Sequence, residues 1–166
     1  MIRENDRFHG AALGLIIDSW GGPLHVKRIT VVGGGAYEID DRSVIYLKYS
    51  TARLSPWNFT FHPEHWEALD ELSSNYDTCV VGLVCNQDGV AGLNLDELQA
   101  IRPLRTQRAL GVAIRREPRH LYSVSCGRNA LPYKVSRDAL VDKLKGFHHQ
   151  LRLDPSLPWP LPIEKQ

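Results

Sequence analysis

A continuous apolar run at residues 79–85, CVVGLVC, constrains the fold of this chain more than any other feature. Polar residues flank the run, and apolar and polar side chains do not alternate within it. It therefore predicts a strand that is buried on both faces. Asp88 and Gly89 form a turn signal after it, so we expect residues 90–93 to return as a short strand.

The first half of the chain is expected to run in the order helix, three strands, helix, strand. Apolar residues at helical spacing predict helices near residues 5–20 and 63–76, and β-branched or alternating segments predict strands at residues 24–32, 36–39 and 44–50. Residues 59–61 form a short extended piece. Asn94 and Glu97 have the spacing of a capping box, which predicts a further helix that ends before Pro103.

The second half predicts a meander of strands at residues 109–115, 120–126 and 130–135, followed by a last helix capped by Ser136. A chain of 166 residues fits one domain. We expect a single α/β domain at residues 1–153, with a mixed-sheet core at 1–93 and the meander and helix appended at 94–153. Residues 154–166 contain four prolines and predict an extended tail.

A β-hairpin is predicted at residues 37–50, and its register decides which side chains share a face of the sheet. A two-residue turn at residues 41–42 pairs Tyr37 with Tyr46 and puts Glu38 on the face opposite Lys48. A three-residue turn at residues 41–43 pairs Glu38 with Tyr46 and puts Glu38, Asp40 and Lys48 on one face. Both turn lengths are common, so the sequence leaves this choice open.

With acids on its second strand and a lysine on its third, the chain resembles the restriction-endonuclease-like, PD-(D/E)xK, nuclease superfamily over about residues 4–93. That superfamily has the same order of elements around a mixed sheet. The resemblance implies a nucleic-acid-processing protein, a Mg²⁺-dependent phosphodiesterase in which Glu38, Asp40 and Lys48 are catalytic and Glu38, Asp40 and Glu4 hold the metal. The chain departs from the pattern at Tyr46, two residues before the lysine, where the superfamily has an acid.

The alternative interpretation is structural. Lys48 is then an edge-strand lysine that prevents aggregation, and Asp40-Asp41 is a simple turn. In that case the chain is a non-catalytic interaction module that keeps the fold and binds nucleic acid or an acidic protein. The two interpretations differ in whether Glu38, Asp40 and Lys48 converge on one face.

Charge is distributed unevenly along the sequence. Residues 1–101 carry 7 Lys/Arg against 14 Asp/Glu, a net charge of −7, whereas residues 102–152 carry 12 against 3, a net charge of +9. Such a basic segment attracts nucleic acid or an acidic partner, unless the two parts neutralise each other across the fold. The best candidates for phosphate contacts cluster around the two turns of the meander: Arg115, Arg116, Arg119 and Arg128.

Three cysteines without paired spacing favour a reducing compartment, and no apolar run approaches the roughly 20 residues of a membrane helix. The charged residues of the first ten positions precede no uninterrupted apolar core, and no small-residue cleavage site follows, so we do not expect a signal peptide here. We therefore expect a cytoplasmic protein that does not enter the membrane.

Overall fold

The computed structural model describes residues 1–103 and 108–146, and it confirms the α/β class. The helices in this part of the chain are α1 (Glu4–Trp20), α2 (Pro63–Asn75), α3 (Leu95–Ile101) and α4 (Ala139–Leu144). The strands are β1 (Val26–Ile29), β2 (Gly35–Ile39), β3 (Ser43–Ser50), β4 (Trp57–Phe61), β5 (Thr78–Cys85), β6 (Val90–Asn94), β7 (Leu110–Arg115), β8 (Ser123–Cys126) and β9 (Asn129–Ala130). Among the described residues, no helix has both the length and the apolar character needed to cross a membrane.

Sheet A is mixed and has the strand order β1-β2-β3-β5-β6. β1, β2 and β3 form an antiparallel meander, and α2 follows before β5 pairs with β3 in parallel. β6 returns antiparallel to β5. Residues 80–85 of β5 are buried, so the prediction of a strand covered on both faces is confirmed.

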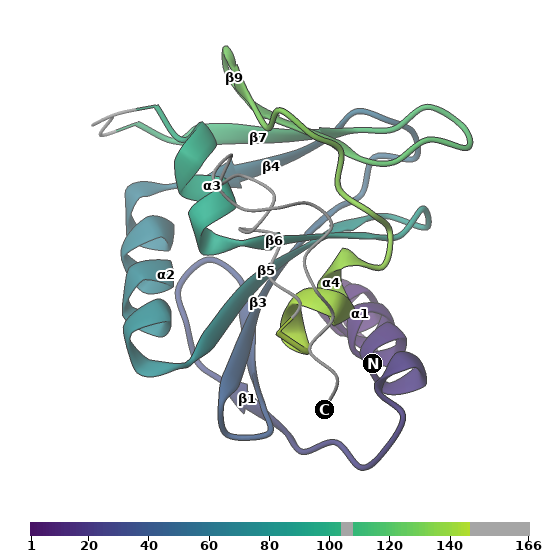
Figure 1. Ribbon diagram of the computed structural model, residues 1–166, viewed down its shortest axis with the longest axis vertical. Coiled ribbons are helices and arrows are strands. Elements are labelled where there is room, and N and C mark those ends of the chain that lie inside the picture. Colours follow the sequence, from purple (N-terminus) through teal and green to yellow (C-terminus); the bar gives the residue numbers. More distant parts are fainter. Residues whose placement is uncertain (104–107, 147–166) are drawn as a thin grey trace, which may run out of the picture.

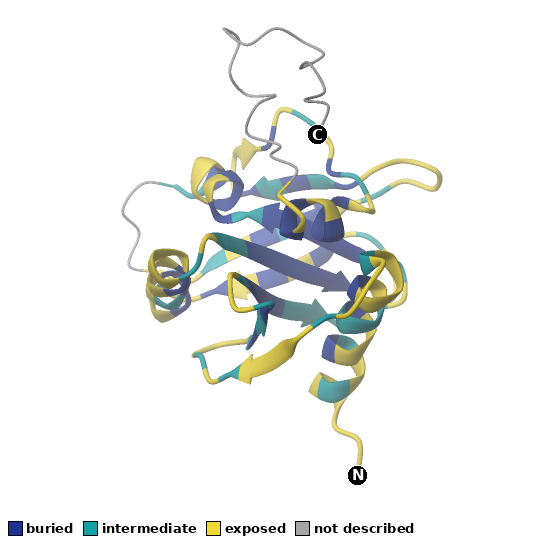
Figure 2. Cartoon of the chain, turned by 60° about the horizontal axis from the view of Figure 1, so that its bottom comes forward, coloured by how far each residue is buried: buried dark blue, intermediate teal, exposed yellow. Residues whose placement is uncertain are grey.

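Each face of sheet A carries its own apolar core. One core joins side chains of β2, β3 and β5 to α1 and α4, and the other joins the opposite face to α2, α3 and sheet B. These layers are visible in Figure 1. Figure 2 shows the buried residues concentrated on the strands between the layers, with exposed residues along the outer sides of the helices.

Sheet B is antiparallel, with the strand order β4-β7-β8-β9. In β4 the residues Trp57, Phe59 and Phe61 are buried, whereas Asn58 and Thr60 face solvent. The three aromatic side chains therefore belong to the core. Because β4 pairs with β7, the meander forms one sheet with a strand from the first half of the chain.

Two glycines allow α4 to lie directly on sheet A. Gly82 of β5 and Gly92 of β6 are register partners. A Cβ atom on Gly92 would lie 2.5 Å from the Cα of Leu140, which is closer than two carbon atoms can approach. The small residues thus set the contact between α4 and the sheet.

Several predicted boundaries are wrong. α1 begins at Glu4, one residue before the predicted start of the first helix. The strand predicted at residues 24–32 is shorter and consists of β1 alone, because the chain leaves the sheet after Ile29, before the glycine loop. The strand predicted at residues 130–135 reduces to β9 and an isolated bridge between Tyr122 and Val135; Pro132 has no N–H to donate to a ladder.

The last helix is preceded by Asp138 rather than Ser136. The extended tail predicted at residues 154–166 lies outside the described residues.

Candidate functional site

The β2–β3 hairpin turns at residues 40–42, so that Glu38 pairs with Val44 and Ile39 with Ser43. Neither predicted register is right: the turn has three residues, but it lies one residue earlier than expected. Asp40 (φ 51°) and Asp41 (φ 61°) adopt the left-handed conformation, which aspartate tolerates better than most residues. The prediction that these two residues form a turn is confirmed.

Glu38 and Lys48 share a face of sheet A but do not meet. Lys48 lies four residues beyond Val44, which separates the two backbones by about 13 Å along the strand at about 3.3 Å per residue. Glu38 Oε2 accepts a hydrogen bond of 2.6 Å from the hydroxyl of Tyr76, directly after α2, and this bond lowers the pKa of Glu38. Tyr76 was not predicted as the partner of Glu38, because it lies 38 positions away in the sequence.

Lys48 is held by uncharged groups. Its Nζ donates a hydrogen bond of 2.9 Å to the carbonyl oxygen of Gly33 and lies 5.1 Å from the centre of the Phe61 ring. Burial lowers the pKa of Lys48 to about 8. Within residues 1–103 and 108–146 no carboxylate lies within ion-pair distance of it. β3 lies between β2 and β5, so the interpretation of Lys48 as an edge-strand residue is wrong.

The bond from Lys48 fixes the glycine loop that precedes β2. The hydroxyl of Tyr46 donates to the carbonyl oxygen of Val32 at 2.9 Å, next to the Lys48 contact. A Cβ atom on Gly33 would lie 1.9 Å from Nε2 of His65, so only glycine fits there. Tyr46 and Lys48 therefore tie this loop to β3.

Asp40 and Glu4, the other two predicted metal ligands, each have partners of their own. Oδ1 of Asp40 accepts a hydrogen bond of 2.8 Å from the backbone N–H of His25, which fixes the segment before β1. Glu4 begins α1 and lies close to Tyr49, whose pKa is raised by burial and by this carboxylate. Because Tyr49 and Lys48 are neighbours on one strand, their side chains point to opposite faces of the sheet.

The predicted Mg²⁺ ligands are thus not brought together. Mg²⁺ demands near-octahedral oxygen ligands, with one or more carboxylates at about 2 Å. Nowhere in the described part of the chain do three or more His, Cys, Asp or Glu side chains form a group that could hold a metal ion. Glu38, Asp40 and Glu4 do not fit the role that the nuclease resemblance implies for them.

The four predicted phosphate-contacting arginines fall into two groups. Arg115, Arg119 and Arg128 are exposed on or beside sheet B, and none forms an ion pair within the described residues. Arg115 donates to the hydroxyl of Ser125 at 3.0 Å. Arg116, in contrast, binds both carboxylate oxygens of Asp88.

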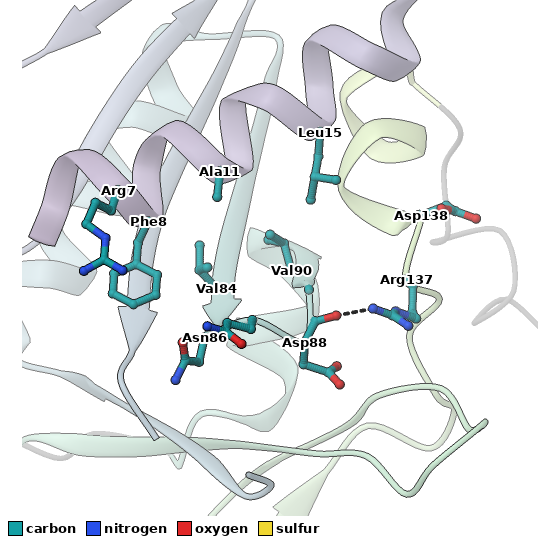
Figure 3. Close-up of a pocket in the computed structure, with 12 residues that line it drawn as sticks. Arg7, Phe8, Ala11, Leu15, Val84, Asn86, Asp88, Val90, Arg137 and Asp138 are labelled. Atoms are coloured by element: carbon teal, nitrogen blue, oxygen red, sulfur yellow. Dashed lines mark hydrogen bonds between the residues drawn. The ribbon is translucent and has the colours of Figure 1, made fainter. Parts of the chain in front are cut away.

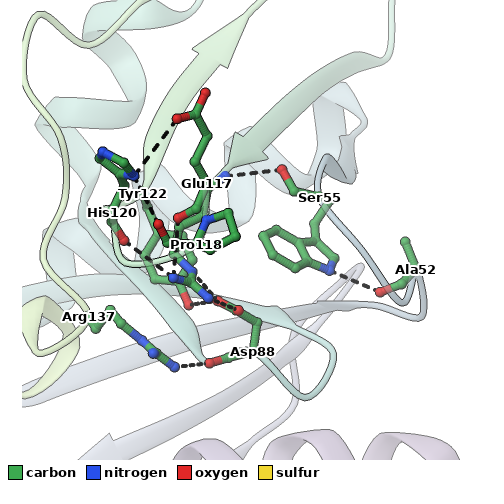
Figure 4. Close-up of polar contacts among 10 residues, drawn as sticks. Ala52, Ser55, Asp88, Glu117, Pro118, His120, Tyr122 and Arg137 are labelled. Atoms are coloured by element: carbon green, nitrogen blue, oxygen red, sulfur yellow. Dashed lines mark hydrogen bonds and ion pairs between the residues drawn. The ribbon is translucent and has the colours of Figure 1, made fainter.

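Asp88 is the centre of a polar cluster that links the β5–β6 turn to sheet B (Figure 4). Its carboxylate also accepts a hydrogen bond of 2.7 Å from Tyr122, and its backbone oxygen accepts one from Arg137. The side chains of Asp88 and Arg116 are each 16% exposed. Arg116 holds the pKa of Asp88 below its ordinary range. The sequence marked Asp88 only as a turn residue, because its partners lie 28 and 34 positions away.

A second buried cluster joins α3 to α4. Glu97 receives the predicted capping-box bond from the N–H of Asn94 (3.0 Å), which is confirmed, but it also binds Lys143 Nζ (2.6 Å) and the hydroxyl of Tyr133. Lys143 further donates to the oxygen of Gly92 at 2.8 Å. Burial alone would raise the pKa of Glu97, but Lys143 and the other donors bring it below its ordinary value.

In comparisons with protein-family models, with curated proteins and with solved structures, nothing matches the chain. The candidate sites are therefore argued from the chain's own geometry.

Proposed function

We propose that this protein is a non-catalytic nucleic-acid-binding module that contacts the phosphate backbone with the outer face of sheet B. The observation that carries the proposal is the contrast among its arginines. Arg115, Arg119 and Arg128 are exposed without an acidic partner in the described residues, whereas Arg116, in the same segment, is neutralised by Asp88. Unpaired guanidinium groups are available to phosphate oxygens, which they bind in a bidentate manner.

The arrangement of the arginines supports contact along the length of the sheet. Arg115 ends β7, and Arg119 lies exposed in the β7–β8 turn with a left-handed backbone (φ 67°). Arg128 lies in the opposite turn, between β8 and β9. The positive charges thus stand at both ends of the β7–β8 pair.

The face between these ends supports backbone contact rather than contact with bases. Its side chains are small: Gly111 and Ala113 of β7, and Ser123 and Ser125 of β8. Small side chains let a phosphate backbone approach the sheet closely. The outward positions of the described strands of sheet B hold no aromatic residue on which a base could stack.

The core supports a scaffold role. It keeps the order of elements around a mixed sheet on which the nuclease resemblance rests, but its acids and its lysine are bound to separate partners. Cleavage would need these groups around one phosphate. Binding needs only the exposed arginines.

The test is fluorescence anisotropy with a labelled DNA duplex of about 20 base pairs and a second duplex of unrelated sequence, over a range of NaCl concentrations. We expect both duplexes to bind alike and affinity to fall steeply with salt. The triple variant Arg115→Ala, Arg119→Ala, Arg128→Ala should lower the slope of log K against log salt by about three. The matched control is Arg42→Ala, which removes an exposed arginine at the far end of sheet A.

Binding without salt dependence, an unchanged slope in the triple variant, or no binding to either duplex would contradict the proposal. The last result would favour an acidic protein as the partner of this face.

A further inference from the structure

A pocket of about 880 Å³ lies between α1 and the β5–β6 turn, away from the outer face of sheet B (Figure 3). It opens beside the carboxyl end of β5, which runs parallel to β3. In open α/β sheets, ligands bind preferentially in crevices outside the carboxyl ends of strands. The volume is within the usual range for a small-molecule site.

The middle of the pocket is apolar. Ala11 and Leu15 of α1 lie one helical turn apart above it, and Val84 and Val90 lie below. Leu15 is 46% exposed, so the pocket leaves apolar surface open to solvent. A ligand with an apolar body would cover that surface.

Two arginines stand at opposite ends of this apolar stretch (Figure 3). Among the described residues the side chain of Arg7 makes no hydrogen bond or ion pair, and the side chain of Arg137 bonds only to the backbone oxygen of Asp88. The carboxylate of Asp88, which Arg116 already binds, also interacts with Arg137 and offsets part of its charge. Asp138 lies next to Arg137 in the chain and offsets charge at that end, which leaves Arg7 as the stronger anchor.

The lower rim of the pocket is rigidly built. Asn86 has a left-handed backbone (φ 49°), and its side-chain amide donates to the carbonyl oxygens of Thr51 and Ala52 at 3.0 and 3.2 Å. Gly89 has φ 151°, and a Cβ atom there would lie 2.7 Å from the hydroxyl of Tyr122. A rim held on both sides in this way is pre-formed for a ligand.

We propose that this pocket binds a small organic anion, with its carboxylate or phosphate group at Arg7 and its apolar body along Ala11, Leu15 and Val84. Guanidinium groups bind both kinds of anion in a bidentate manner. The proposal does not depend on nucleic-acid binding by sheet B, because the two sites share no lining residue.

The experiment titrates octanoate and octyl phosphate into the ¹⁵N-labelled protein and follows amide chemical shifts, with octanol as the neutral probe of the same length. We expect saturable shifts at residues 86–90 and along α1, and weaker binding of octanol. Arg7→Ala should weaken octanoate binding about tenfold, as expected for the loss of one charge-assisted contact. Ala11→Trp should block binding by filling the pocket from an exposed helix position.

Arg42→Ala is the matched control and should bind octanoate as the unmodified protein does. Melting curves of Ala11→Trp separate a blocked pocket from a misfolded chain. Equal binding of octanol and octanoate, or unchanged octanoate affinity in both Arg7→Ala and Ala11→Trp, would overturn the proposal. Tighter binding of octyl phosphate than of octanoate would identify a phosphate ester as the preferred class.

Discussion

Two lysines of this protein, the half-buried Lys48 and the fully buried Lys143, have very different partners. The side chain of Lys143 is 2% exposed. Its Nζ forms an ion pair with Glu97 and donates a hydrogen bond to the carbonyl oxygen of Gly92. Lys48 reaches only the Gly33 carbonyl and the Phe61 ring. The sequence pointed to Lys48 as the functional lysine, yet it is Lys143 that lies beside a carboxylate.

This difference shows that a lysine whose sequence neighbours include acids need not lie close to those acids in the folded protein. Along β3, about 13 Å separates Lys48 from Val44, the residue that pairs with Glu38. Lys143 and Glu97 are 46 positions apart in the chain, but packing of α4 on β6 brings them to 2.6 Å. The comparison can be tested by removing one charge at a time.

The largest effect is expected at Lys143. Replacing it by Met leaves the carboxylate of Glu97, 1% exposed, without its cation, which should cost about 3–5 kcal/mol of unfolding free energy. The measurement is chemical denaturation. Lys48→Met should cost far less, and the double variant Lys143→Met, Glu97→Gln should recover much of the loss. An equal loss of unfolding free energy in Lys143→Met and Lys48→Met would contradict the difference between the two lysines.

Asp88 should give the next largest effect. Asp88→Ala leaves Arg116 and the Tyr122 hydroxyl without their acceptor, which should cost about 2–3 kcal/mol at pH 7. Because the folded-state pKa of Asp88 is lowered, this stability is present above its unfolded pKa of about 3.9 and is lost as pH falls through the folded value. The gap between wild type and variant should therefore close below about pH 4.

The control for Asp88 is Asp77→Ala, which removes an exposed ion pair with Arg42 whose side chains are 67% and 81% exposed. Such pairs contribute roughly 0–1 kcal/mol. A pH-independent gap for Asp88→Ala would mean that its charge does not stabilise the fold.

The smallest effect is expected from Mg²⁺. With the predicted ligands dispersed, about 5 mM Mg²⁺ should change the melting temperature by less than about 1 °C, because only ligands that bind the folded state stabilise it. Glu38→Ala should respond in the same way as the unmodified protein. A clear rise in the unmodified protein that is absent from Glu38→Ala would restore the metal site.

Much of the fold could be predicted because local patterns carry it. The uninterrupted apolar run of β5, the turn at Asp88-Gly89 and the capping box at Asn94 and Glu97 are each encoded within a few residues. The hairpin register could not be predicted, since it depends on left-handed backbone at Asp40 and Asp41 that either turn length could accommodate.

The candidate site was less predictable for a related reason. Arg115, Arg116, Arg119 and Arg128 look alike in the sequence, and only the distant Asp88 separates Arg116 from the rest. Likewise, nothing near Glu38 in the sequence indicates that Tyr76 binds it. Polar partners far apart in the chain leave no periodic signal, so they appear only once the fold is known.

The most direct test of the account is the pKa of Lys48, measured by NMR titration of its side-chain Nζ and Cε signals, with Lys48→Met used to assign them. The central claim is that this half-buried lysine contacts only uncharged groups, as expected if the core is the scaffold that we propose. The account predicts a pKa of about 8. A value at or above the ordinary lysine pKa of about 10.4 would contradict it, because Lys48 would then be either in contact with water or close to a carboxylate.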